Sequence, residues 1–97
     1  MVKLLTMIYD SAIDETLMEL LGELGVEAYT KIFDAHGLGG RGRKENTPVW
    51  PGTNHLVLIA IAEPEARRII GAVRRLQATY RLRPGITMLL QDVEVVP

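Results

Sequence analysis

A stretch in the middle of the chain, residues 34–54, divides it into two halves. It reads DAHGLGGRGRKENTPVWPGTN and holds five glycines, two prolines and the only tryptophan, with neither helical nor strand periodicity. An irregular connection of about twenty residues is uncommon inside a compact domain and usually marks function or disorder. Because both flanks carry clear helix and strand patterns, we interpret this stretch as a functional loop within a single domain that spans residues 1–97.

The first half predicts a strand, a helix and a second strand. Residues 2–9 form a short apolar run that is typical of a strand. The helix that follows has one apolar stripe, made of Ile13, Leu17, Leu20, Leu21 and Leu24. Gly25 is suited to end this helix in the left-handed conformation. Residues that favour extended backbone then predict a second strand over residues 26–33.

The second half repeats this pattern. Residues 55–62 (HLVLIAIA) are continuously apolar, which is typical of a strand buried on both faces. Pro64 suits the first turn of a second helix. The apolar stripe of that helix consists of Ala66, Ile69, Ile70, Val73 and Leu76. After the break at RLRPG, residues 86–96 alternate in character and predict a last strand.

The order of these elements predicts an α+β fold of the ferredoxin-like βαββαβ type. Both helices would pack on one face of a four-stranded antiparallel sheet, with the long loop between strands two and three. Two helices cover only one face, yet the first and third strands are apolar on both sides. The second face would be an unusually large exposed apolar patch, so we expect a closed assembly of several copies.

Composition excludes several classes of protein. The formal net charge of −1 argues against a generally basic nucleic-acid-binding protein, and the absence of cysteine excludes disulfides and thiolate metal sites. No apolar run approaches the length of a membrane span, and the N-terminus lacks the layout of a signal peptide. No nucleophile stands beside a recognisable base, and Ser11, the only serine, is expected to cap a helix. We therefore expect a cytoplasmic protein that is not an enzyme and does not insert into membranes.

The loop combines glycines with clustered cations. Gly37, Gly39 and Gly42 match the spacing of a dinucleotide fingerprint, but no helix pattern follows them, so we reject the Rossmann interpretation. Backbone N–H groups near these glycines could still approach an anion, with charge from nearby cations. Composition by itself favours the alternative, a solvated and mobile surface loop.

Two other features of the loop admit a functional interpretation. Trp50 either anchors the loop on the domain or contacts a partner protein. Its position between two prolines favours the first interpretation. His36 and His55 could join Asp34 in a metal site, but the spacing lacks a short ligand pair, so no metal is expected.

Two stretches resemble the PII-like signalling proteins, the superfamily of the nitrogen regulatory PII proteins. They are ELGVEAYTKIFDAHGLGGRGR and RPGITMLLQDVEVV, and the resemblance covers nearly the whole chain. It implies a ferredoxin-like trimer that binds an effector, often an adenine nucleotide, in the clefts between subunits. It also implies that the long loop contacts a regulated protein, which would be a transporter or an enzyme. On this basis Thr30, Gly37, Gly39 and the turn around Gly85 would face the ligand.

The chain also departs from the family pattern. It lacks the tyrosine-bearing loop tip, and Ile86 stands where the family has a lysine before its last strand. Trp50, Pro51 and Gly52 resemble the CutA proteins, which are trimers of the same fold linked to divalent metals, although the His-Pro-Tyr motif of that family is absent. A CutA-like metal-binding trimer is therefore the alternative function.

The favoured hypothesis is a homotrimeric regulator that binds a small anionic effector. The residues expected to bind the effector are Thr30, Gly37, Gly39, Gly40, Arg41, Arg43, Arg81, Arg83 and Gly85. Lys44 and Trp50 are expected to contact the regulated protein.

Overall fold

The computed structural model describes residues 2–39, 42–44 and 52–97. In chain order the elements are β1 (Val2–Asp10), the 3-10 turn η1 (Ser11–Ile13), α1 (Asp14–Glu23), β2 (Thr30–Ala35), β3 (Gly37–Gly39), β4 (Gly42–Lys44), β5 (Asn54–Ala62), α2 (Glu63–Ala78) and β6 (Ile86–Val93).

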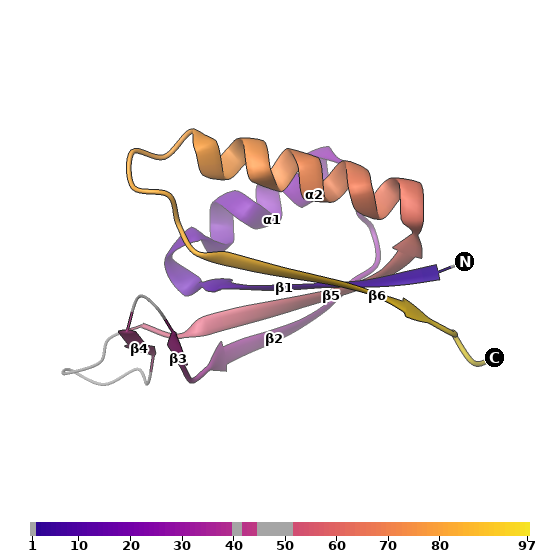
Figure 1. The fold of residues 1–97 in the computed structure, drawn as a ribbon, viewed down its shortest axis with the longest axis horizontal. Helices are drawn as coiled ribbons and strands as arrows, with labels where there is room; N and C mark the ends of the chain where they lie inside the picture. Colours follow the sequence, from indigo (N-terminus) through magenta and orange to yellow (C-terminus); the bar gives the residue numbers. More distant parts are fainter. Residues whose placement is uncertain (1, 40–41, 45–51) are drawn as a thin grey trace.

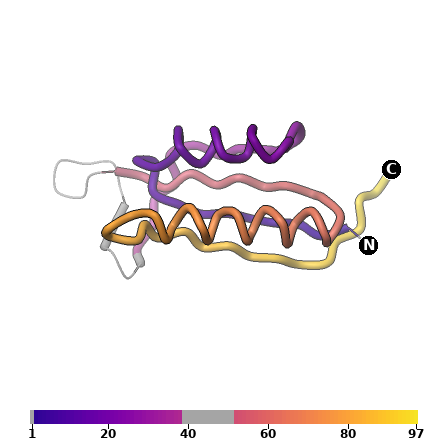
Figure 2. Tube along the Cα trace, turned by 90° about the horizontal axis from the view of Figure 1, so that it is seen from above, coloured from indigo at the N-terminus to yellow at the C-terminus, as the bar shows by residue number. Residues whose placement is uncertain are grey.

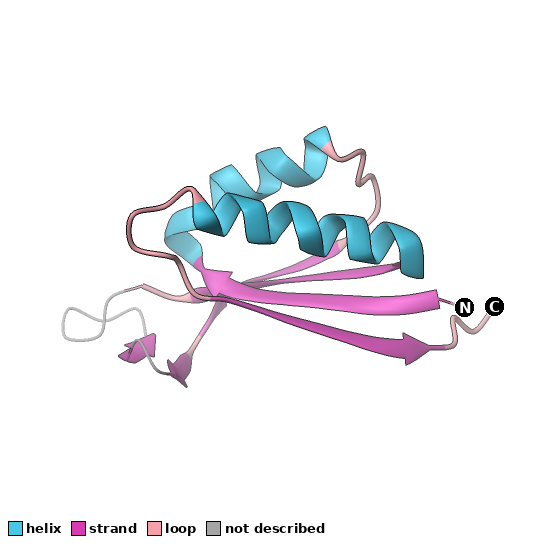
Figure 3. Ribbon diagram, turned by 45° about the horizontal axis from the view of Figure 1, so that its top comes forward, coloured by secondary structure: helices cyan, strands magenta, loops and turns pink. Residues whose placement is uncertain are grey.

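Four of the strands form one antiparallel sheet in the order β2-β5-β1-β6. Figures 1 and 3 show both helices on the same face of this sheet, and Figure 2 shows them side by side above it. This is the predicted ferredoxin-like βαββαβ arrangement, which is confirmed. Since neither described helix is both long and apolar enough, no helical span across a membrane is found in this part of the chain.

The core lies between the sheet and the two helices. Successive side chains of a strand point to opposite faces, so the odd-numbered residues of β1 and β5 all face the helices. The core side chains, each at most 1% exposed, are Leu5, Met7, Tyr9, Leu17, Leu21, Val57, Ile59, Ile69 and Val73. The predicted helix stripes supply several of them. They form the continuous apolar interior that holds the helices to the sheet.

The opposite face of the sheet carries no helix. The even-numbered residues of β1 and β5 point to it, and they include Leu4, Ile8, Leu56 and Leu58. On the outer strands, Ile32 is 48% exposed and Leu89 is 50% exposed. The expectation that the first and third strands of the sequence prediction, β1 and β5, are apolar on both faces is thus confirmed. We call this surface the open face.

The ends of α1 depend on short-range backbone chemistry. Gly25 has a φ of 80°, and its N–H donates to Gly22 O while the Val26 N–H donates to Leu21 O. These two bonds satisfy carbonyls at the helix end in the Schellman arrangement. At the other end, the predicted cap at Ser11 is wrong, because Ile13 stands at the N-cap of α1 and makes no side-chain cap bond. Asp10 instead caps the preceding turn η1, where its Oδ1 accepts the Ala12 N–H at 2.8 Å.

The predicted limits of the second strand, the last strand and the irregular stretch between the halves differ from those in the structure. The second strand begins at Thr30 rather than at residue 26, and the last strand ends at Val93 rather than at residue 96. The stretch 34–54 is not structureless throughout, because β2 continues to Ala35, β5 begins at Asn54, and β3 pairs with β4. The pairing of two strands rests on backbone hydrogen bonds, which glycines can form, so a glycine-rich segment can pair without any side-chain periodicity.

Candidate functional site

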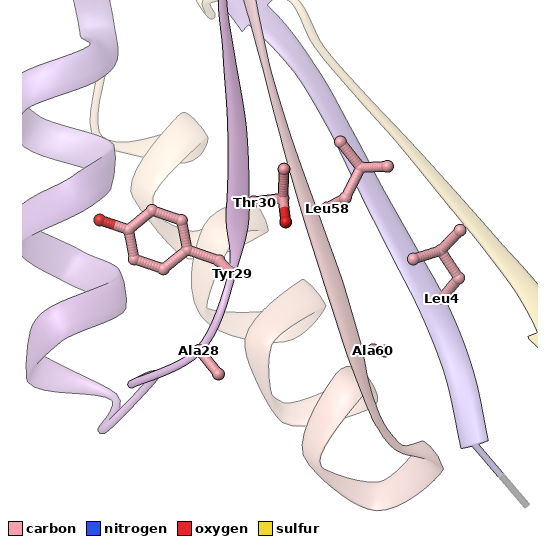
Figure 4. Close-up of a pocket in the computed structure, with 6 residues that line it drawn as sticks. All are labelled: Leu4, Ala28, Tyr29, Thr30, Leu58 and Ala60. Atoms are coloured by element: carbon pink, nitrogen blue, oxygen red, sulfur yellow. The ribbon is translucent and has the colours of Figure 1, made fainter. Parts of the chain in front are cut away.

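The open face carries a groove among the residues that the structure describes. It has a volume of about 470 Å³ and is lined by Leu4, Ala28, Tyr29, Thr30, Leu58 and Ala60 (Figure 4). Strand register places these residues together, because Thr30 pairs with Leu58 across β2 and β5, and Leu4 pairs with Ala60 across β1 and β5. The strand order and register of the sheet therefore explain why these residues lie together in the groove.

The chemistry of the groove is mostly apolar. Figure 4 shows Leu4, Leu58 and Thr30 on one side of the strands, whereas the Tyr29 ring is directed toward α1. Thr30 thus contributes a hydroxyl at the edge of an apolar floor. A surface of this kind fits a flat, largely apolar group that has a polar edge, the usual composition of a small-molecule site.

One chain does not bring all the predicted ligand residues together. Thr30 lines the groove at the start of β2, whereas Gly37 and Gly39 lie in β3, beyond the other end of that strand. The six residues of β2 span about 17 Å at about 3.3 Å per residue. A ligand in the groove of one chain would therefore not reach these glycines of the same chain.

The predicted basic turn lies between α2 and β6. Arg81, Arg83 and Gly85 are exposed there, and the turn is held by the buried Gln77, whose Nε2 donates to Pro84 O at 2.9 Å. Figures 1 and 2 show this turn and the β3–β4 pair at the same end of the molecule, away from the chain termini. The structure thus gathers the turn and the glycines at one end, but it leaves Thr30 apart from them.

The remaining predicted residues are described only in part. Gly40, Arg41 and Trp50 lie outside the described residues. Arg43 and Lys44 belong to β4, where the backbone alone is described.

A polar cluster that the sequence did not predict lies near this end, on the helix side of the sheet. The Asp14 carboxylate accepts hydrogen bonds from Tyr9 Oη and Lys31 Nζ, both at 2.6 Å. The side chains of Lys31 and Asp14 are 11% and 23% exposed. Lys31 Nζ also lies 4.5 Å from the centre of the Phe33 ring. The cluster ties α1 to β1 and β2 around a partly buried ion pair.

The pKa values of the cluster follow from these contacts. Burial would raise the pKa of Asp14, but the hydrogen bonds from Lys31 and Tyr9 outweigh it, and the pKa lies below its ordinary value. Burial and the hydrogen bond to the Asp14 carboxylate raise the pKa of Tyr9 well above its ordinary value. Lys31 is therefore paired with an ionised carboxylate at neutral pH. Lys31 is 17 residues from Asp14 in sequence, so no local pattern could have revealed the pair.

A second polar cluster joins the two ends of the stretch 34–54. The pairing of β2 with β5 shifts register between Ile32 and Ala35, so that Phe33 and Asp34 both lie opposite His55. His55 Nδ1 accepts the Asp34 N–H at 3.1 Å, and Asp34 Oδ1 accepts the Thr53 hydroxyl at 3.0 Å. Asp34 has a φ of 57°, a left-handed conformation that costs about 1–2 kcal/mol for a residue other than glycine. We call Asp34, Thr53 and His55 the loop-base cluster.

The loop-base cluster bears on the metal hypothesis. No group of three or more His, Asp or Glu side chains suited to a metal ion occurs among the residues that the structure describes. His55 is 7% exposed and its Nδ1 already accepts a hydrogen bond, while His36 is exposed between β2 and β3. The geometry therefore gives the CutA-like alternative no support.

Comparison with known proteins identifies the fold. No family model matches the chain, and no curated protein sequence matches it. Among solved structures, the chain is similar to a PII-like signalling protein of Thermus thermophilus, with 27% identity, a TM-score of 0.68, and coverage of 98% of this chain and 89% of that one.

Two further structures agree with this result at lower identity. CPII of Thiomonas intermedia K12 is a nitrogen regulatory PII-like protein solved with ADP, AMP and bicarbonate. It is 19% identical, with a TM-score of 0.69 and coverage of 95% of this chain and 87% of that one. A protein of unknown function from Pediococcus pentosaceus ATCC 25745 is 17% identical, with a TM-score of 0.69 and coverage of 99% and 95%. In its fold, over nearly its entire length, the chain is similar to PII-like proteins.

Proposed function

We propose that the chain is a cytoplasmic, non-enzymatic regulator that binds an adenine nucleotide, with the base in the groove of the open face. The observation that carries this proposal is the groove itself, which offers an apolar floor of Leu4, Leu58 and Ala60 beside the Thr30 hydroxyl. A purine is flat, largely apolar on its faces and polar at its edge, so it suits such a surface. The similarity to CPII, which was solved with ADP and AMP, supports the same ligand class.

We further propose that the active form is a trimer that buries the open face. The support is the apolar character of that face, where Ile32 and Leu89 are about half exposed in the single chain. Monomers rarely leave such contiguous apolar surface in water. In this arrangement each groove lies at a junction between copies, where a second chain supplies groups that the first cannot reach.

The phosphates of the nucleotide would lie against basic residues from another copy. One chain separates Thr30 from Gly37 and Gly39 and from the turn that holds Arg81, Arg83 and Gly85, so a neighbouring copy is needed to bring these groups to one ligand. Cations and backbone N–H groups are the natural partners of a phosphate. Gly40, Arg41 and Arg43 belong to the same proposed set, and Lys44 and Trp50 would contact the regulated transporter or enzyme.

Titration calorimetry with ADP, AMP and ATP tests the proposal. We expect heat of binding for at least one of them. Ala60→Leu, which adds bulk to the floor of the groove, should weaken binding. The matched control is Thr87→Leu, a substitution on β6 of the same open face that does not line the groove, and it should leave affinity unchanged.

Sedimentation of the same variants separates nucleotide binding from assembly. If Ala60→Leu remains as oligomeric as the native chain but loses the nucleotide, the groove is the binding site. Absence of heat with all three nucleotides, or equal loss in both variants, contradicts the proposed site. A chain that sediments as a monomer at every concentration contradicts the proposed trimer.

A further inference from the structure

The loop-base cluster contains a hydrogen bond that depends on the protonation of a histidine. Asp34 lies in the two-residue bulge of β2, where the regular pairing with β5 is interrupted, and its N–H donates to His55 Nδ1. The imidazole therefore acts as a side-chain acceptor for a backbone N–H at this interruption. This bond crosses directly from the last residues of β2 to the first residues of β5, which are the two ends of the stretch 34–54.

Asp34 is exposed, whereas the other two members of the cluster, Thr53 and His55, are buried. Thr53 is 3% exposed, its hydroxyl donates to Asp34 Oδ1, and its carbonyl accepts the Ser11 N–H at 2.9 Å. The Phe33 ring packs edge-on against His55 with ring centres 5.0 Å apart, and the Tyr9 ring lies at 6.1 Å on another side. The imidazole is thus fixed between two aromatic rings, with Nδ1 directed at the bulge.

A ring nitrogen that accepts a hydrogen bond cannot carry a proton. The observed geometry therefore requires a neutral His55 with its hydrogen on Nε2. Protonation of Nδ1 would place an N–H against the Asp34 N–H, so the bond would be lost. Histidine is the side chain whose charge ordinarily changes between pH 5 and pH 8.

We propose that protonation of His55 releases the Asp34 N–H and loosens the bulge where β2 and β5 meet, so that the strand pairing at the base of the stretch 34–54 weakens at acidic pH. The charged groups on the elements packed around the ring are the Asp14 carboxylate of α1 and, on β2, the Asp34 carboxylate and the Lys31 ammonium. Tyr9 of β1 remains neutral in this range. The hydrogen bond from the Asp34 N–H to His55 Nδ1 is present at neutral and higher pH and is lost as pH falls.

Nuclear magnetic resonance on the ¹⁵N-labelled chain, titrated from pH 8 to pH 5, tests the proposal. The ring nitrogens of His55 report its tautomer and charge, and hydrogen exchange reports the protection of the Asp34 amide. We expect the protection factor of this amide to fall about five- to tenfold as the ring becomes charged, which corresponds to the loss of one hydrogen bond. Amides of the central strand pair, such as Val57, should keep their protection.

Two variants provide matched controls. H55N keeps an acceptor oxygen near the position of Nδ1 but does not titrate, so the Asp34 amide should stay protected down to pH 5. H36N removes the other histidine, which is exposed, and should titrate like the native chain. A charged His55 ring with an unchanged Asp34 amide, or the same transition in H55N, would overturn the proposal. So would a native ring that stays neutral down to pH 5.

Discussion

The two faces of the sheet are built from the same strands but meet different surroundings. Leu4 and Leu5 are neighbours in β1 with the same side chain, yet Leu5 is fully buried under the helices and Leu4 lines the groove of the open face. The covered face is closed by α1 and α2 within one chain. The open face is not covered within one chain, and Ile32 and Leu89 on it are about half exposed.

The covered face accounts for the stability of the chain, whereas the open face is the surface available for association or ligand binding. The covered face brings together the helix stripes and the odd-numbered strand residues, and so provides the hydrophobic free energy of folding. The open face places equally apolar side chains on a surface that one copy leaves in water. Such a surface is expected at sites of association or ligand binding. Substitutions at paired positions on the two faces can therefore distinguish the two roles.

The largest effect is expected for Leu5→Ala. Removing a fully buried leucine from the covered face should lower the free energy of unfolding by about 2–5 kcal/mol, because the transfer free energy is lost and a cavity remains. Urea denaturation followed by circular dichroism measures it. A loss below about 1 kcal/mol would mean that the covered face is not the main source of stability.

The next effect concerns the ion pair that joins α1 to β2. Asp14→Asn should lower the free energy of unfolding at pH 7 by about 1.5–3 kcal/mol, the range for a hydrogen bond to a charged group. The pKa of Asp14 is lowered in the folded chain, so its contribution is present above the unfolded pKa and disappears as pH falls through the folded one. The difference between the two chains should therefore begin to shrink below about pH 4 and disappear only below the lowered folded pKa.

The matched control for Asp14→Asn is Glu19→Gln, an exposed carboxylate on the same helix. It should change the free energy of unfolding by less than about 0.5 kcal/mol. Equal losses in the two variants at pH 7 would show that the ion pair of Asp14 and Lys31 adds no more to the free energy of unfolding than an exposed carboxylate does.

A smaller effect tests the backbone turn that places α1 over the sheet. Gly25→Ala should cost about 1–2 kcal/mol, because φ is 80° at this position although space is free around it. Gly22→Ala, three residues earlier and inside the helix, should instead stabilise by about 0.5–1 kcal/mol. Thermal unfolding of the two variants gives opposite shifts if the turn requires glycine; shifts of the same sign would contradict this assignment.

The smallest effect on a single chain is expected for Leu4→Ala. Leu4 is only partly buried, so the loss in a dilute monomer should stay below about 1 kcal/mol, a fraction of the value for full burial. If copies cover the open face, the unfolding midpoint of the native chain rises with protein concentration and Leu4→Ala reduces that dependence. Midpoints that do not change with concentration in the native chain would mean that the open face stays uncovered.

Sequence patterns predicted most of the fold because the signals were local. The apolar stripes of both helices, Pro64 in the first turn of α2 and Gly25 at the end of α1 follow from spacing and backbone conformation alone. The start of β2 was misplaced by four residues, since Val26 and Tyr29 favour a strand but residues 26–29 do not belong to one. Pairing depends on a partner strand, which local preference does not contain.

The candidate site was predictable only in its parts. Thr30 was selected by resemblance, and the structure places it in the groove, but the groove also needs Leu4 and Leu58 from two other strands. The hydrogen bond that joins His55 to Asp34 was not predicted, because the two residues stand 21 residues apart and neither has a local motif. His55 was considered as a metal ligand, whereas in the structure it accepts a backbone N–H.

The sequence by itself determined the order of the elements, the α+β class and the presence of two apolar faces, because side-chain periodicity of 2.0 or 3.6 is written locally in the chain. Only the tertiary structure decided which leucines enter the core, how Thr30 meets Leu58, and that His55 holds the bulge at Asp34. These depend on strand register and on side chains brought together from distant positions. A shift of one residue in register would exchange the two faces of a strand, and no single segment encodes that choice.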